Sequence, residues 1–136
     1  MDTEELIRKV IGAAISVHRE LGPGYLESVY ENALAVELDH LSIHFERQKI
    51  VPICYRGQPV GEHRLDMLIE ERLIIENKAV AELVPVFFVI VRSYLKAMNL
   101  ADALLFNFAA MPLTIKRVGP EDVSRFHANQ PEGVSF

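Results

Sequence analysis

The chain has 136 residues, of which 50% are hydrophobic and 24% are charged, and its formal net charge is −5 at pH 7. A composition this apolar excludes a disordered chain, and the length is that of one globular domain, so we expect a single domain over residues 1–136. The negative charge argues against nonspecific binding of a polyanion by the whole surface. Any contact with nucleic acid must therefore be local.

The cysteine content and the N-terminus favour a cytoplasmic protein. The single cysteine, Cys54, excludes an intramolecular disulfide and any multi-cysteine zinc site, and we expect it to be a small core residue in a strand. Residues 1–5 are acidic where a signal peptide would be basic. The most apolar stretch, 79–91, contains Glu82 and Pro85 and is shorter than the about 20 apolar residues needed to cross a bilayer, so no membrane span is expected.

Two helices are predicted in the first third of the chain. The first begins at about Thr3, which could cap it, and its apolar residues recur at steps of four and three: Leu6, Val10, Ala14, Val17 and Leu21. Gly22-Pro23-Gly24 ends this helix, because glycine adopts positive φ and proline cannot continue the helical hydrogen bonds. The second helix covers about residues 25–41.

Three strands should follow. The segments 45–55 and 60–70 alternate in hydrophobicity, and the short connection 56–59 between them predicts a hairpin. A third strand is expected at 73–80, joined to the second by residues 71 and 72.

The last third of the chain contains one ambiguous segment. Residues 86–91 are β-branched and aromatic, which favours a strand, yet they lead without a break into a helix-favouring sequence. We predict a helix over 85–99, because a strand there would leave no crossover before the next apolar run, the strand 103–108. A short edge strand at 115–118 completes the order α-α-β-β-β-α-β-β, and the tail from Glu121 is expected to form a final helical turn and then fray.

This order predicts the fold class α/β: one domain with a mixed central sheet of four or five strands flanked by helices. Charged residues interrupt the apolar strands of this sheet. Asp66 lies within the second strand, and Glu76 and Lys78 lie in the third, where period-two alternation places them on one face. On the second helix, Glu27 shares a face with Leu34 and points toward the core side.

Burying an unpaired carboxylate costs several kcal/mol, so this acidic and lysine set is either a compensated ion-pair network or a functional site. Taken one at a time, charges in strands are usually ion pairs or solvated. As a set, a carboxylate on one strand and Glu-x-Lys on the next can converge on a hard divalent cation, beside which an ammonium orients a water or stabilises developing phosphate charge.

The same residues carry a family resemblance. Residues 24–30 read Gly-Tyr-Leu-Glu-Ser-Val-Tyr, a match to Gly-x-x-Glu-x-x-Tyr, and are followed at a distance by Asp66 and by Glu76-Asn77-Lys78. With Ser93-Tyr94-Leu95-Lys96 and Asn107-Phe108 downstream, the chain resembles the GxxExxY family of the PD-(D/E)XK nuclease superfamily over about residues 5–118.

The resemblance implies a restriction-endonuclease-like core and a Mg²⁺- or Mn²⁺-dependent nuclease that cleaves nucleic acid, with DNA favoured over RNA. It implies that Glu27 is the acidic residue of the helix, that Asp66 and Glu76 are the metal-binding pair, and that Lys78 is the catalytic lysine. The expectation is therefore that the carboxylates of Glu27, Asp66 and Glu76 share one cation, with the Lys78 ammonium beside them.

One segment departs from the family pattern. Members usually carry a polar His-Glu-Ala-Gln type stretch at the start of the later helix, whereas residues 87–90 here read Phe-Phe-Val-Ile. Ile90 thus stands where a glutamine would position substrate or water. Either the activity is altered or lost, or this surface contacts a homodimer partner or another protein, since six consecutive apolar residues cannot all be hidden by one helix stripe.

Three further residues are secondary site candidates. His18, near the end of the first helix, adjoins the turn that leads to Glu27, although a lone histidine there is more often packed or capping. Tyr30 and Tyr94 are expected to be core rings with hydrogen-bonded hydroxyls, with phosphate contact as the alternative.

Two functions remain open: a metal-dependent phosphodiesterase, or a non-catalytic nuclease-like module that binds nucleic acid or protein.

Overall fold

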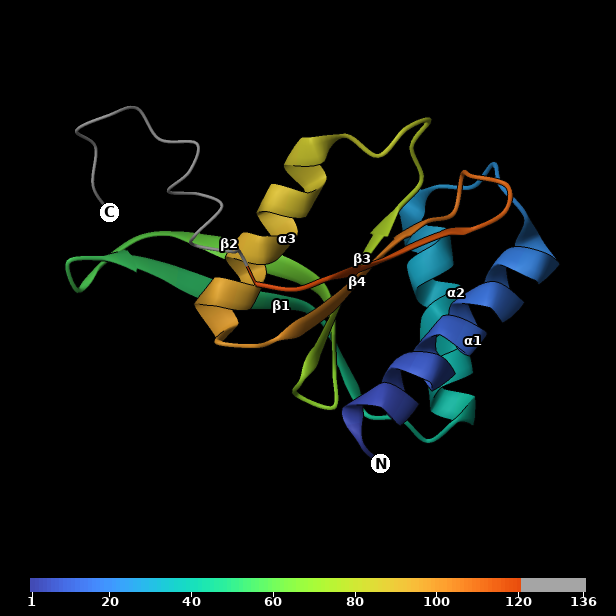
Figure 1. Ribbon diagram of the computed structural model, residues 1–136, viewed down its shortest axis with the longest axis horizontal. Coiled ribbons are helices and arrows are strands. Elements are labelled where there is room, and N and C mark those ends of the chain that lie inside the picture. The colour runs from blue at the N-terminus through green and yellow to red at the C-terminus, as the bar shows by residue number, and fades with distance from the viewer. Residues whose placement is uncertain (121–136) are drawn as a thin grey trace.

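One mixed sheet forms the centre of the computed structural model, which describes residues 1–120 (Figure 1). Its five strands lie in chain order, and β3 and β4 run parallel while every other neighbouring pair is antiparallel. The strands are β1 (Phe45–Tyr55), β2 (Gln58–Ile69), β3 (Leu73–Lys78), β4 (Asp102–Asn107) and β5 (Thr114–Val118). The predicted order of elements, the mixed sheet and the edge position of β5 are confirmed.

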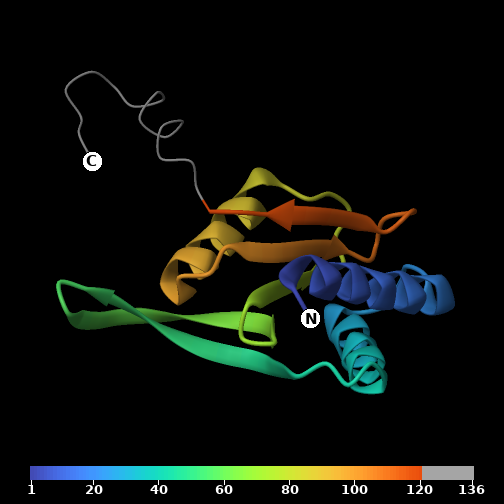
Figure 2. The same cartoon turned by 60° about the horizontal axis from the view of Figure 1, so that its bottom comes forward.

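Helices cover both faces of the sheet. The helices α1 (Thr3–Leu21) and α2 (Glu27–His40) pack together on one face, and α3 (Pro85–Met98) lies on the other, as Figures 1 and 2 show. Two apolar clusters result. One joins α1 and α2 to residues such as Met67, Ile75 and Phe106, and the other joins α3 to residues such as Ile74 and Leu105.

The ambiguous segment is a helix, as predicted. A parallel pair of strands needs a crossover, and α3 supplies it between β3 and β4. Pro85 occupies the first helical turn, where its missing N–H costs no helical hydrogen bond. Burial of Val91, Tyr94 and Leu95 against the sheet stabilises a helix whose β-branched residues would otherwise favour a strand.

The ends of α1 differ in one detail from the sequence prediction. Asp2, not Thr3, is the N-cap, and its carboxylate accepts a hydrogen bond of 2.8 Å from the Glu5 amide. An aspartate one residue earlier satisfies the same free amide and also favours the positive end of the helix dipole. At the other end Gly22 has φ 68°, and its amide donates to His18 O at 2.8 Å, which confirms the predicted turn.

The β1–β2 hairpin is tighter than predicted. Its connection contains only Arg56 and Gly57, with φ of 52° and 75°, and β2 begins at Gln58 instead of residue 60. Two residues with positive φ match the twist of the flanking strands, but arginine is an unusual residue for the first of them. Cys54 is exposed instead of buried, because it belongs to the end of the hairpin, where residues 54–62 are all exposed.

The strand β3 ends at Lys78, two residues earlier than predicted, because a side chain replaces the sheet pairing beyond it. The Asn107 Nδ2 donates to Val80 O at 2.9 Å, and its Oδ1 accepts from Val80 N at 3.1 Å. The Phe108 amide also donates to Lys78 O at 2.8 Å. These contacts fix the backbone at the end of β3, where the candidate site residues lie.

Two further expectations concern a C-terminal helical turn and a membrane span. The helical turn predicted from Glu121 lies outside the described residues. Within residues 1–120, no helix has both the length and the apolar character needed to span a bilayer.

Candidate active site

Asp66 on β2 and Glu76 on β3 are neighbours across the sheet. Met67 pairs with Ile75, so the residue before Met67 and the residue after Ile75 lie opposite one another. Period two places both carboxyl groups on the face that α3 covers, where Leu68 and Ile74 belong to the α3 cluster. The Asp66 carboxylate is held there by the Asn77 amide, which donates to Oδ2 at 2.8 Å.

Glu76 is the more deeply buried and the less satisfied of the two acids. Its relative exposure is 6%, and its Oε1 is buried without a hydrogen-bond partner in the described part of the chain. Burial and the nearby Asp66 carboxylate raise the pKa of Glu76 to about 8. Burial also raises the pKa of Asp66, against the opposing effect of the Asn77 amide. The pair therefore holds a proton near neutral pH unless a cation replaces it.

Lys78 stands beside this pair at the end of β3. Its Nζ is 3.8 Å from Glu76 Oε2, and its side chain is 20% exposed. The same Nζ lies over the Phe87 ring of α3, at 4.6 Å from the ring centroid. The structure therefore brings Asp66, Glu76 and Lys78 together on one face of the sheet.

Glu27 does not join the other two carboxylates, in contrast to the sequence expectation. It is exposed at the first position of α2, and its Oε1 accepts from the Ala79 amide at 3.4 Å, just beyond the end of β3. Among residues 1–120, no group of three His, Cys, Asp or Glu side chains is close enough to hold a metal ion. Glu27 starts from α2, on the opposite face of the sheet, and its carboxylate comes to the end of β3, where its charge still contributes to the raised pKa of Glu76.

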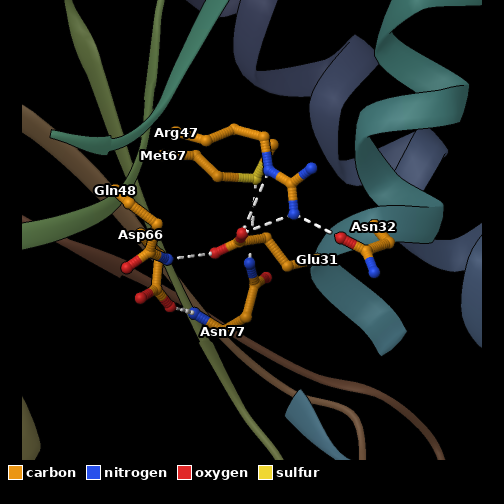
Figure 3. A network of polar contacts seen from close by, with 7 residues as sticks. All are labelled: Glu31, Asn32, Arg47, Gln48, Asp66, Met67 and Asn77. Carbon is orange, nitrogen blue, oxygen red and sulfur yellow. Dashed lines mark hydrogen bonds and ion pairs between the residues drawn. The ribbon is translucent and has the colours of Figure 1, made fainter. Parts of the chain in front are cut away.

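The acid that α2 does bury is Glu31, one turn after Glu27, and sequence reasoning missed it. Its Oε2 accepts from Arg47 Nε at 3.0 Å and Nη2 at 2.7 Å, and its Oε1 accepts from Gln48 Nε2 at 2.8 Å (Figure 3). Arg47 Nη2 also contacts Asn32 Oδ1. The helical stripe that contains Leu34 includes Glu31, and this periodicity was the one signal that could have found it.

This cluster of Glu31, Arg47 and Gln48 joins α2 to β1, the strand that pairs with β2 opposite Asp66. Gln48 has φ 52°, an uncommon value for a residue with a side chain, and it lies between the pairs Arg47–Met67 and Lys49–Leu65. Gln48 is thus across from Asp66 (Figure 3). The hydrogen bond from Gln48 Nε2 to Glu31 Oε1 connects this position of β1, opposite Asp66, to α2.

The secondary candidates have separate places. His18 is buried, and its Nε2 donates to Ala110 O at 2.9 Å, so it joins α1 to the connection between β4 and β5. The Tyr30 hydroxyl donates to Gly22 O at 2.7 Å and its ring stacks on Phe108, as expected of a core ring. Tyr94 differs, because burial and the Glu76 and Asp66 carboxylates raise the pKa of its hydroxyl to about 12. Of the three, Tyr94 adjoins the acidic pair.

The fold and this arrangement of two acids and a lysine on adjacent strands define a nuclease-like α/β core. The family model of the PD-(D/E)XK nuclease superfamily matches residues 4–118, and the chain belongs to this superfamily. Among solved structures, the one described as "Crystal structure of SSO0001" is similar with a TM-score of 0.54 and 16% sequence identity, a likeness of fold alone. The match covers 72% of this chain and 52% of that chain, so this chain spans about half the length of its structural neighbour. A search of curated proteins finds no match.

The Glu31 cluster predicts a stability effect. Glu31→Gln keeps the side-chain shape but removes the charge that pairs Arg47, so we expect a loss of about 1–3 kcal/mol in the free energy of unfolding, measured by urea denaturation. Glu37→Gln is the control, because it makes the same change on the same helix at a residue with no ion pair in the described part of the chain. Equal effects of the two substitutions would contradict the assignment.

The raised pKa of Glu76 predicts a pH dependence of stability. The folded protein binds this proton up to about pH 8, whereas the unfolded chain releases it near the usual value of 4.5. Stability contributed by the protonated group is therefore complete below pH 4.5 and is lost as pH rises through about 8. In metal-free buffer, we expect the melting temperature of the wild type to fall relative to Glu76→Gln between pH 5 and 8.5. Parallel pH profiles would disprove this, and the exposed Glu82→Gln serves as the control.

Proposed function

We propose that the protein is a metal-dependent nuclease of the cytoplasm that hydrolyses phosphodiester bonds of nucleic acid, with DNA as the favoured substrate. The observation that carries this proposal is the buried pair of Asp66 and Glu76 with the Lys78 ammonium 3.8 Å from Glu76, in a chain of the PD-(D/E)XK superfamily. The Gly-x-x-Glu-x-x-Tyr sequence at residues 24–30 supports the narrower assignment to the GxxExxY family.

The residues present fit a divalent cation such as Mg²⁺ or Mn²⁺. Glu76 Oε1 is a buried acceptor that lacks a donor, and the neighbouring Asp66 carboxylate repels it until a proton or a cation intervenes. Mg²⁺ is commonly bound through one or two carboxylates together with waters and substrate phosphates, so a third protein ligand is not required. Asp66 and Glu76 would hold the cation, and Glu27 would lie at the outer end of the site. When bound, the cation would act as a Lewis acid on a phosphate oxygen and lower the pKa of a water bound to it.

The roles of the other residues follow from their positions. The Lys78 ammonium, at the partly open end of the pair, orients a water or stabilises the negative charge that develops on the attacked phosphate. The Asn77 amide keeps the Asp66 carboxylate in place through its 2.8 Å hydrogen bond. Tyr94, whose pKa is raised to about 12 by burial and by the two acids, keeps a protonated hydroxyl near neutral pH, which would serve as a hydrogen-bond donor.

A metal titration and a cleavage assay test the proposal together. We expect Mg²⁺ or Mn²⁺ to raise the melting temperature, since a ligand at 100 times its Kd stabilises the folded state by about 2.7 kcal/mol. Asp66→Asn and Glu76→Gln should abolish both this shift and the cleavage of labelled single- and double-stranded DNA and RNA. Asp39→Asn, an exposed aspartate on α2, should retain both.

The same variants separate a catalytic site from a structural ion network. Without metal, Asp66→Asn and Glu76→Gln should raise stability by relieving carboxylate repulsion, whereas Lys78→Ala should lower it by leaving the acids uncompensated. Equal loss of stability in all three variants, with no metal-dependent cleavage in the wild type, would contradict the nuclease and favour a structural network.

The alternative function is a nuclease-like module that binds a protein partner or a second copy of the chain. The observation that favours it is the outer side of α3, where Val86, Val89 and Ile90 are 52%, 57% and 37% exposed. Phe87 and Phe88, by contrast, are half-buried in the chain's own core. An apolar surface of this kind beside a site is typical of an interface.

Sizing and light scattering at increasing protein concentration test this surface. If it is a homodimer interface, the wild type should associate and Ile90→Glu should be a folded monomer. Ile15→Glu is the matched control on α1, because Ile15 has the same exposure of 37%. A wild type that stays monomeric at high concentration would contradict self-association through α3.

A further inference from the structure

The apolar start of α3 contains one residue that contacts the site directly. Phe87 lies in the first turn of α3, and the Lys78 Nζ is 4.6 Å from the centroid of its ring. We propose that Phe87 is a positioning residue, whose ring face holds the Lys78 ammonium beside Glu76. This inference rests on the proposed nuclease function, in which Lys78 acts on the attacked phosphate or on a water.

The surroundings of Lys78 show why a positioning contact matters. The ion pair with Glu76 Oε2 spans 3.8 Å, which is longer than a hydrogen bond, and within residues 1–120 the Lys78 ammonium donates no hydrogen bond. A lysine side chain has four rotatable carbon–carbon bonds and loses considerable freedom when it is fixed. The ring is therefore the second contact, besides the Glu76 carboxylate, that restricts the position of the ammonium.

An aromatic ring is suited to this task. The face of a phenyl ring carries partial negative charge, so it attracts an ammonium without removing its proton or competing as a strong acceptor. Phe87 is half-buried among the residues that pack α3 on the sheet, which fixes the ring itself. Its place in the first turn of α3 brings it to the end of β3, where Lys78 lies.

This contact changes the interpretation of residues 87–90. A polar side chain was expected near this point of the helix to help position substrate or water, and its absence left the activity of the site open. The ring of Phe87 supplies a different positioning contact, directed at the lysine of the site. The apolar sequence is then compatible with an ordered Lys78.

The first measurement is made on the metal-free protein and does not depend on activity. Protons on the face of an aromatic ring are shifted upfield, so the Lys78 ε-methylene signals in lysine-labelled protein should be displaced from those of exposed lysines. Lys78→Arg identifies these signals by their absence. We expect Phe87→Leu to abolish the displacement, Phe87→Tyr to retain it, and Phe88→Leu, the neighbouring ring, to leave it unchanged.

The second measurement uses cleavage with Mg²⁺ or Mn²⁺. Loss of a cation–π contact should lower kcat by about 2- to 30-fold in Phe87→Leu with little change in KM, because the ammonium is displaced while the substrate-binding surface remains. Phe87→Tyr should restore the rate, and melting curves confirm that each variant is folded.

The outcomes distinguish this inference from the proposed function. Unshifted Lys78 signals in the wild type, or equal effects of Phe87→Leu and Phe88→Leu, would overturn the role of Phe87 whether or not the protein cleaves nucleic acid. A rate unaffected by Phe87→Leu would overturn it as well. Displaced Lys78 signals in a wild type that cleaves no substrate would instead overturn the nuclease function and leave the ring contact established.

Discussion

The burial of two neighbouring carboxyl groups is the constraint on which this site depends. Asp66 and Glu76 lie opposite one another on β2 and β3, under α3, where burial raises the pKa of both and the Asp66 carboxylate further raises that of Glu76. One ammonium, that of Lys78, and one main-chain amide, that of Asn77, offset part of the cost of ionising them. Apolar residues of similar volume would serve folding at least as well at these positions. The pair is therefore better explained by a task than by stability.

A second buried carboxylate, that of Glu31, allows a comparison with Glu76. Glu31 and Glu76 are almost equally buried, at 7% and 6% exposure, yet their surroundings differ. Both oxygens of Glu31 accept hydrogen bonds from Arg47 or Gln48, whereas Glu76 Oε1 has no donor in the described part of the chain. The fold is thus able to satisfy a buried carboxylate completely. It does so on the α2 face, whereas on the α3 face Glu76 lies beside a second acid and depends on a proton or a cation.

Periodicity predicted most of the fold because burial imposes it, but local side-chain contacts decided the ends of the elements. The end of β3 depends on the Asn107 side chain, and the start of α1 on Asp2. Period two in adjacent strands likewise predicted that Asp66, Glu76 and Lys78 converge. It did not predict the position of Glu27, because a helical face gives a direction around the axis but neither the position along it nor the side of the sheet that the helix covers. Glu31 was missed because its partners come from β1, which sequence spacing does not relate to α2.

The helix α3 connects the topology of the sheet to the chemistry beside Lys78. As the crossover between β3 and β4 it has to pack apolar residues on the sheet, and Val91, Tyr94 and Leu95 do so. Its first turn consequently lies at the end of β3, where the Phe87 ring meets Lys78. The chemistry near the lysine is therefore set by the topology of the fold together with a single residue type. A polar residue at this point is one solution and an aromatic ring is another, so the apolar sequence of residues 87–90 does not by itself indicate an inactive site. The more informative feature is the pair of Asp66 and Glu76, because a buried carboxylate oxygen that no donor within residues 1–120 satisfies, held beside a second acid, requires either a proton or a cation.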